Sequence, residues 1–132
     1  MIIDSSALLA VVLSEPDAPQ FARAIARGDT RRLPSVTWFE ASMRVDTKGD
    51  AFAINRFDDF LKDFRIEIIP FTADHAREAR RARVLYGKPH HPARLNFGDC
   101  MVYGVAKHER DTLLFKGDDF LKTDIVPALK GQ

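Results

Sequence analysis

The sequence has little cysteine, no long hydrophobic run and no strong excess of charge of either sign. Its 132 residues include one cysteine, Cys100, which excludes an internal disulfide and a cysteine-rich metal site. The most apolar stretch near the start, Ala7 to Leu13, is too short to span a membrane, and no basic segment precedes it as in a signal peptide. We therefore expect a cytoplasmic protein that does not associate with a membrane.

Several catalytic motifs are also missing. The glycines form no loop ending in Gly-Lys-Ser/Thr, so a P-loop nucleotide site is excluded. Ser6 stands two positions after Asp4, where phosphatases that form an aspartyl phosphate carry a second aspartate, and this disfavours that chemistry. Twenty Lys and Arg against 19 Asp and Glu give a net charge of +1. A polybasic tail is thereby excluded, but a local basic patch for nucleic acid is not.

What is present is the composition of one globular domain, with 45% hydrophobic and 30% charged residues. Short apolar runs alternate with helical patterns. Strands are expected at 1–3, 33–34, 66–71 and 112–115, helices at 7–14, 17–28, 35–46, 51–63, 73–85 and 98–108, and an extended segment at 123–127. This alternation predicts an α/β protein, a three-layer α/β/α sandwich around a mostly parallel sheet of four to five strands, over residues 1–132.

Local patterns predict how individual helices begin and which faces they bury. Ser5 or Ser6 is a candidate cap for the first helix. In the helix at 51–63, the spacing of Ile54, Phe57 and Leu61 predicts one buried apolar face. In the helix after Ser35, the same spacing places Glu40 on one face with apolar neighbours, namely Val36, Phe39 and Met43.

Acidic residues lie just beyond the strands or early in the helices that follow them. These are Asp4, Glu40, Asp99, Asp118 and Asp119. Ligands of parallel α/β sheets bind outside the carboxyl ends of the strands, so these side chains are expected to meet at one edge. Like charges brought together cost free energy unless something neutralises them, and a divalent cation such as Mg²⁺ or Mn²⁺ is the usual solution.

Each acid taken alone also has a simpler structural explanation. Asp4 could end a strand or cap a helix, and Glu40 could form an exposed pair with Arg44. Asp99 could be a first-turn acid favoured by the helix dipole. Asp118 and Asp119 follow Gly117, as residues of an exposed turn do.

Four segments resemble PIN-domain ribonucleases, specifically the VapC-type toxins of bacterial toxin–antitoxin pairs. They occur in the family's order at 1–8, 39–42, 91–100 and 113–125, and the last two are the most specific. The resemblance covers essentially the whole chain and implies a single PIN domain. It further implies Mg²⁺- or Mn²⁺-dependent hydrolysis of RNA with one or two ions, a cognate VapB-type antitoxin, and a homodimer.

The resemblance also assigns roles to individual residues. Asp4, Glu40 and Asp99 would be the core acids, with Asp118 favoured as the fourth and Asp119 as its substitute, and Ser6 would support Asp4. The basic residues leading to Asp99 are candidates for RNA phosphates, or else form a solvated surface; they are Arg77, Arg80, Arg81, Lys88, His91 and Arg94. The alternative is a non-catalytic PIN-like module that binds RNA or protein, which the complete acidic set disfavours.

Overall fold

A four-stranded parallel sheet forms the centre of the protein. The computed structural model describes residues 1–48 and 50–129. The sheet has the order β3-β2-β1-β4, formed by β1 (Ile2–Ile3), β2 (Arg32–Pro34), β3 (Glu67–Ile69) and β4 (Leu113–Leu114). The predicted α/β class is confirmed, with four strands. The segment predicted to be extended at 123–127 adds one isolated parallel bridge, between Leu113 and Pro127.

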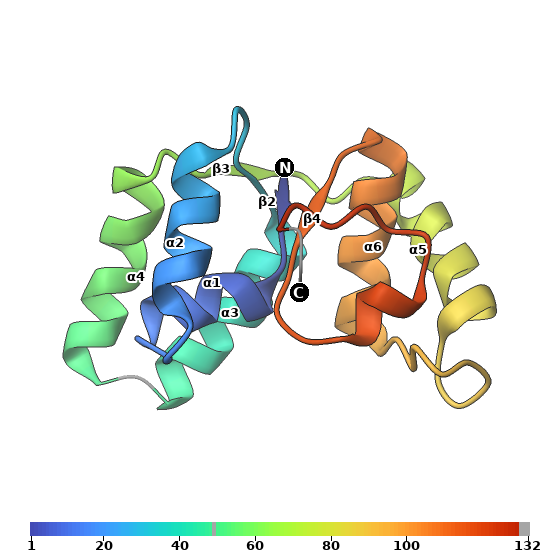
Figure 1. Ribbon diagram of the computed structural model, residues 1–132, viewed down its shortest axis with the longest axis horizontal. Helices are drawn as coiled ribbons and strands as arrows, with labels where there is room; N and C mark the ends of the chain where they lie inside the picture. The colour runs from blue at the N-terminus through green and yellow to red at the C-terminus, as the bar shows by residue number, and fades with distance from the viewer. Residues whose placement is uncertain (49, 130–132) are drawn as a thin grey trace.

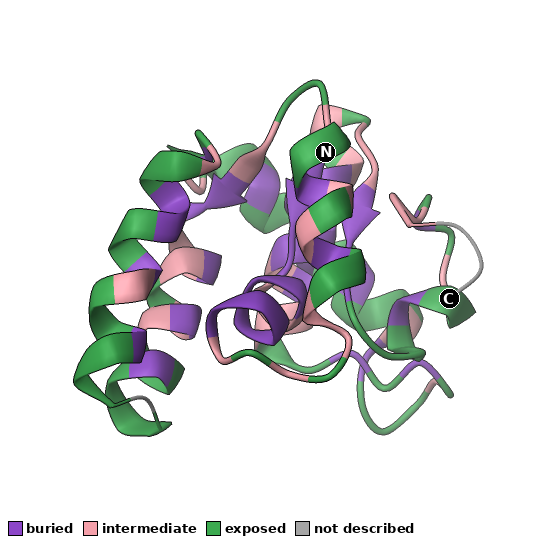
Figure 2. Cartoon of the chain, turned by 60° about the vertical axis from the view of Figure 1, so that its left-hand side comes forward, coloured by how far each residue is buried: buried purple, intermediate pink, exposed green. Residues whose placement is uncertain are grey.

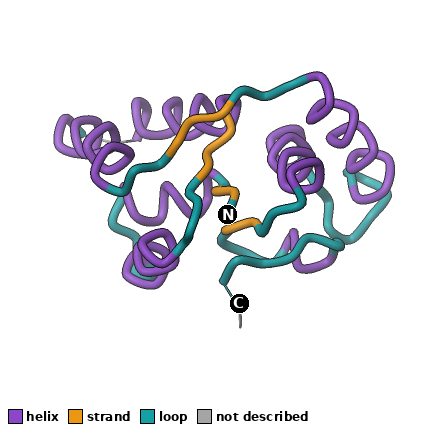
Figure 3. Tube along the Cα trace, turned by 90° about the horizontal axis from the view of Figure 1, so that it is seen from above, coloured by secondary structure: helices purple, strands orange, loops and turns teal. Residues whose placement is uncertain are grey.

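Helices cover both faces of this sheet. They are α1 (Ser5–Val12), α2 (Ala18–Arg27), α3 (Ser35–Lys48), α4 (Ala51–Asp63), α5 (Ala73–Tyr86), α6 (Phe97–Glu109) and the 3₁₀ helix η1 (Asp119–Lys122). Figures 1 and 3 show α1 to α4 on one side of the strands and α5 and α6 on the other. Within the described residues, no helix is both long and apolar enough to cross a membrane.

The alternation of side chains along the strands divides the core into two halves. Ile3, Leu33 and Leu114 belong to the half that α1 to α4 cover, whereas Ile2 and Leu113 belong to the half under α5 and α6. Figure 2 shows the buried residues on the strands and the inward helix faces. The three-layer arrangement follows, because each face of the sheet must be removed from water.

Three local predictions need correction. Asp4, not Ser5 or Ser6, caps α1, because the backbone at Asp4 is extended while both serines already lie in the first turn. In α4, Ala53, Phe57, Phe60 and Leu61 are buried, whereas Ile54 is exposed because the helix turns its Phe60 side to the core.

The third correction concerns the apolar side chains near Glu40. On α3, Phe39 is 59% and Met43 49% exposed, so their stripe lies on the surface. The helix instead buries Thr37, Ala41 and Val45, which are spaced by four residues.

The pairing of α5 with α6 determines where the first turn of α6 lies. The two helices run antiparallel, with the rings of His75 and His108 5.2 Å apart at one end and the backbones of Tyr86 and Leu95 hydrogen-bonded near the other. A side chain on Gly104 would overlap the backbone of α5, since its Cβ would lie 2.8 Å from the Ala79 nitrogen. This close approach holds α6 so that Asp99 faces the carboxyl end of the sheet.

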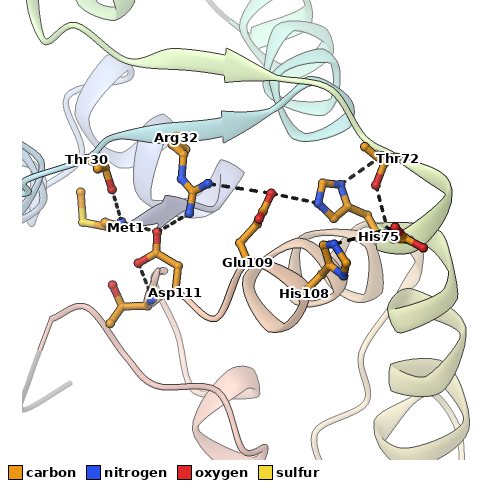
Figure 4. Close-up of polar contacts among 10 residues, drawn as sticks. Met1, Thr30, Arg32, Thr72, His75, His108, Glu109 and Asp111 are labelled. Carbon is orange, nitrogen blue, oxygen red and sulfur yellow. Dashed lines mark hydrogen bonds and ion pairs between the residues drawn. The ribbon is translucent and has the colours of Figure 1, made fainter.

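A network of ion pairs holds the opposite, amino-terminal end of the sheet (Figure 4). Asp111 accepts hydrogen bonds from Arg32 at 2.8 Å and from the Met1 amine at 2.7 Å. Glu109 lies between Arg32 and His75, 3.8 and 3.3 Å from their nitrogens. Partial burial opposes ionisation of Asp111, but these hydrogen bonds outweigh it and lower its pKa. The network ties β1, β2 and α6 together away from the predicted site.

Candidate active site

Asp4 is the most deeply buried acid of the site and lies where β1 ends. It is 5% exposed, and its Oδ2 accepts hydrogen bonds from the backbone N–H of Ser6, at 3.1 Å, and from the Ser6 hydroxyl. The Ser6 Oγ in turn accepts from the backbone N–H of Lys116 at 3.0 Å. Ser6 therefore connects Asp4 to the loop that follows β4.

Glu40 reaches the site from the second turn of α3. Its Oε1 accepts a hydrogen bond from the Ser5 hydroxyl at 2.7 Å, and its carboxylate lies against the first turn of α6 at Gly98. Arg44, the alternative partner considered from the sequence, forms no ion pair with Glu40. The side chain therefore turns toward α1 and α6 rather than along its own helix.

Asp99 lies in the first turn of α6 and forms a capping box with Asn96. Its backbone N–H donates to Asn96 Oδ1 at 2.9 Å, and its Oδ2 accepts from the Asn96 N–H at 3.1 Å. Asp99 is therefore a first-turn acid of α6, as considered from the sequence. It uses one carboxylate oxygen and leaves Oδ1 with no hydrogen-bond partner among the described residues.

Mutual electrostatic effects show that these acids form one cluster. Burial, then the charges of Asp99 and Glu40, raise the pKa of Asp4 to about 6, although the bonds from Ser6 act in the opposite direction. Burial, together with the charges of Asp119 and Glu40, also raises the pKa of Asp99, against the Asn96 N–H bond and Lys88. Asp4, Glu40 and Asp99, which lie after β1 and in α3 and α6, are thus close enough to influence one another electrostatically, and Asp119 influences Asp99.

The two candidates for the fourth acid differ in their surroundings. Both are exposed. Asp119 is the first residue of η1 and acts electrostatically on Asp99. Asp118 precedes η1 and forms no side-chain hydrogen bond that caps it. The electrostatic influence on Asp99 favours Asp119 in the choice that the sequence left open.

The donor chemistry of the cluster suits a hard divalent cation. Asp4 Oδ1 and Glu40 Oε2, like Asp99 Oδ1, have no hydrogen-bond partner among the described residues. No three His, Cys, Asp or Glu side chains in the described ranges come close enough to enclose a metal ion by themselves. An open set of oxygens fits Mg²⁺, which binds through one or two carboxylates and keeps several waters.

The predicted RNA-contacting residues are divided between two regions. Lys88 lies close enough to Asp99 to influence its pKa, and Arg80 lines a groove between α5 and α6 with Phe97, which is next but one to Asp99. By contrast, Arg77 and Arg81 pair with Asp74 and Glu78 of their own helix, at 2.7 and 3.4 Å.

Arg77 is also near the start of α5, at the end farthest from Asp99. In the loop before α6, the His91 Nδ1 accepts a hydrogen bond from the Ala93 N–H at 3.0 Å, and its ring stands edge-on to Tyr86. Arg94 in the same loop is exposed. The structure therefore brings Lys88 near the acids and keeps Arg77 away from them.

Sequence reasoning missed three supporting residues. The first is Ser5, whose hydroxyl holds Glu40. The second is Lys116, whose ammonium pairs with Glu15 and Asp17 at 2.6 and 3.1 Å and so fixes the loop leading to Asp119. Asp124 is the third, because it accepts bonds from Tyr103 and Lys107 of α6, at 2.6 and 2.9 Å. Asp124 lies in the segment 113–125 that resembles the family, which was a signal for it, but no local pattern pairs Lys116 with the α1–α2 loop.

Comparisons with known proteins agree with this architecture. Residues 1–126 match the PIN domain family. Ribonuclease VapC28 of Mycobacterium tuberculosis is 38% identical over 130 residues, 98% of each chain. The chain belongs to the PIN domain family, and its relatives place it with the VapC ribonucleases.

Two solved structures have the same fold. VapC20 of Mycobacterium tuberculosis, described as a toxin that cleaves the sarcin-ricin loop, matches with a TM-score of 0.75 at 15% identity, over 95% of each chain. VapBC2 from Rickettsia felis, bound to a DNA fragment from its promoter, matches with a TM-score of 0.76 at 19% identity, over 96% of this chain and 94% of that one. At these identities the likeness shows the fold alone.

The raised pKa of Asp4 predicts how the stability of the metal-free protein changes with pH. A carboxyl whose pKa is about 6 in the folded protein and 3.8 when unfolded lowers stability as the pH rises between these values, and the loss persists above them. Asp4→Asn keeps a capping side chain and removes the charge. Without metal at pH 7.5 we expect the variant to be more stable by about 1–3 kcal/mol, measured by guanidinium unfolding.

The advantage should shrink as the pH falls from about 6 to 3.8 and should be lost below that, where Asp4 is protonated in both the folded and the unfolded protein. The exposed Asp46→Asn serves as the control and should follow the wild-type profile. An Asp4→Asn variant that is less stable than the wild type at every pH would contradict the assignment of the buried charge.

Proposed function

We propose that this protein is a metal-dependent endoribonuclease that acts as the toxin of a VapBC-type toxin–antitoxin pair. The observation that carries the proposal is that the Ser5 hydroxyl, next to Asp4, holds Glu40 at 2.7 Å, while the Glu40 carboxylate lies against Gly98, next to Asp99, at the carboxyl end of the parallel strands. The names of its 38%-identical relatives, which are ribonucleases, support RNA as the substrate class.

The residues would divide the work of phosphodiester hydrolysis as follows. Asp4, Glu40, Asp99 and a fourth acid, for which we propose Asp119, would hold one or two Mg²⁺ or Mn²⁺ ions. When bound, such a cation polarises the scissile phosphate and lowers the pKa of an attacking water. Ser6 and Ser5 keep the Asp4 and Glu40 carboxylates in place, each through one hydroxyl.

Cations of the protein would bind the phosphates that flank the cut. We propose Lys88 for the position next to Asp99 and Arg80, His91 and Arg94 for the approach to it. Arg77 and Arg81, which are paired within α5, would contribute to the wider field and not to the site itself. The positive charge of Lys88 would also reduce the electrostatic repulsion between the acidic residues and the anionic RNA.

The central test is cleavage of total RNA by antitoxin-free protein. We expect discrete products with Mg²⁺ or Mn²⁺, none with EDTA, and at least about a 100-fold slower reaction for Asp99→Asn. Asp119→Asn should lose more activity than its neighbour Asp118→Asn, because the charge of Asp119 is among the main influences on Asp99. Asp46→Asn on the far end of α3 should keep full activity.

Two outcomes would contradict the proposal. Cleavage that survives Asp99→Asn in a preparation free of contaminating nuclease would remove the acids from the chemistry. Protein that binds RNA but does not cut it, with mass spectrometry showing no bound antitoxin, would favour the non-catalytic binding module.

Exposed apolar residues support the two protein partners that we propose. Phe39 and Met43 of α3 and Phe97 of α6 are 59%, 49% and 81% exposed, on helices that contact each other. We propose this face for a homodimer. On the outer side of α4, Phe52 is 69% exposed beside an open groove reaching Phe64, and there we propose an antitoxin segment.

Light scattering tests the homodimer. We expect twice the mass of one chain for the wild type and the mass of one chain for Phe39→Asp, because a charge cannot be buried unpaired in an apolar interface. Val126→Asp, which changes an equally exposed apolar residue on another segment, should remain dimeric. A wild type that is monomeric at all concentrations, or a Phe39→Asp variant that stays dimeric, would contradict this interface.

A further inference from the structure

Gly98, in the first turn of α6, is in close contact with a side chain from a distant helix. A Cβ atom added at this position would overlap Oε2 of Glu40 and would lie 3.0 Å from its Cδ. The other carboxylate oxygen, Oε1, is held at 2.7 Å by the Ser5 hydroxyl. Glu40 is therefore confined between the first turns of α1 and α6.

The backbone of α6 does not itself require glycine at this position. Gly117 is the glycine with a positive φ in the described part of the chain, so Gly98 has an ordinary helical conformation. A glycine inside a helix makes a protein less stable than an alanine at the same position does, because glycine loses more conformational freedom when the chain folds. The structural reason for glycine here is the space that the Glu40 carboxylate occupies.

The first turn of α6 also favours a negative charge at this place. The backbone N–H groups of Phe97 and Gly98 have no hydrogen-bond acceptor among the described residues, as is usual for the first residues of a helix. The positive end of the helix dipole thus faces the acidic cluster. A carboxylate that approaches this turn closely gains from that field, and a methyl group at position 98 would keep it away.

We propose that Gly98 is a positioning residue, whose missing side chain lets the Glu40 carboxylate lie against α6 beside Asp99, in reach of Ser5. The packing follows from the fold alone, whereas its importance for metal binding rests on the function proposed above. Because Glu40 is a flexible side chain, an added methyl group would displace its carboxylate rather than prevent folding.

A double-mutant cycle in metal-free protein tests the packing. In the Glu40→Ala background, Gly98→Ala should raise the thermal unfolding midpoint by about 2–4 °C, the ordinary gain from replacing a helical glycine. In the wild-type background that gain should be absent or reversed. Glu40→Gln keeps the volume of the side chain and should behave as the wild type does, which separates overlap from charge.

The positioning role is tested by measuring the affinity for Mn²⁺. Binding is monitored through the loss of the electron paramagnetic resonance signal of the free ion. Glu40→Ala should weaken Mn²⁺ binding by about 10-fold, and Gly98→Ala should weaken it by a similar factor with the fold intact. The double variant should bind no more weakly than Glu40→Ala alone, since both changes remove the same carboxylate from the site.

The outcomes distinguish this inference from the proposed function. Equal stabilisation by Gly98→Ala in all three backgrounds would overturn it, as would normal Mn²⁺ binding by Gly98→Ala when Glu40→Ala binds weakly. Normal binding by Glu40→Ala itself would remove Glu40 from the metal site and would overturn the positioning role with it. Absence of RNA cleavage by a wild type that shows the coupling would instead count against the nuclease.

Discussion

Asp4, Glu40 and Asp99 concentrate negative charge at one end of the parallel sheet. The cost is visible at Asp4, which is buried and whose pKa is raised by burial and by its acidic neighbours. The surrounding structure limits this cost with the first turns of α1 and α6, the hydroxyls of Ser5 and Ser6, and Lys88 beside Asp99. A site that is unfavourable without a cation is well suited to binding one.

Contacts outside the acidic site fix the elements that carry its residues. The ion pairs of Asp111 tie the strands at the opposite end, and the close contact of Gly104 with α5 fixes the direction of α6. Lys116 then anchors the loop after β4 to the α1–α2 loop, so that Asp119 comes near Asp99. Rigid elements thereby position each acid, and no acid depends on one loop alone.

Much of the fold could be predicted from the sequence because apolar runs and caps are local signals. The strand after Met1 and the helices at 51–63 and 73–85 were all identifiable in this way. Exposure was less predictable: the stripe of Phe39 and Met43 has helical spacing, but no other part of the described chain covers it. Periodicity shows that residues share a face and does not show what lies against that face.

The candidate acids stood out in the sequence because each one follows a strand or lies early in a helix, and the resemblance pointed to Ser6, whereas the other supports had no such signal. Ser5 and Gly98 matter through contacts with Glu40, which is remote in sequence, and the choice between Asp118 and Asp119 depends on how η1 begins. Anomalous diffraction from crystals soaked in Mn²⁺ tests the central claim most directly. The account predicts a peak bounded by Asp4, Glu40, Asp99 and Asp119; a peak only elsewhere, for example at Glu15 and Asp17, would contradict it.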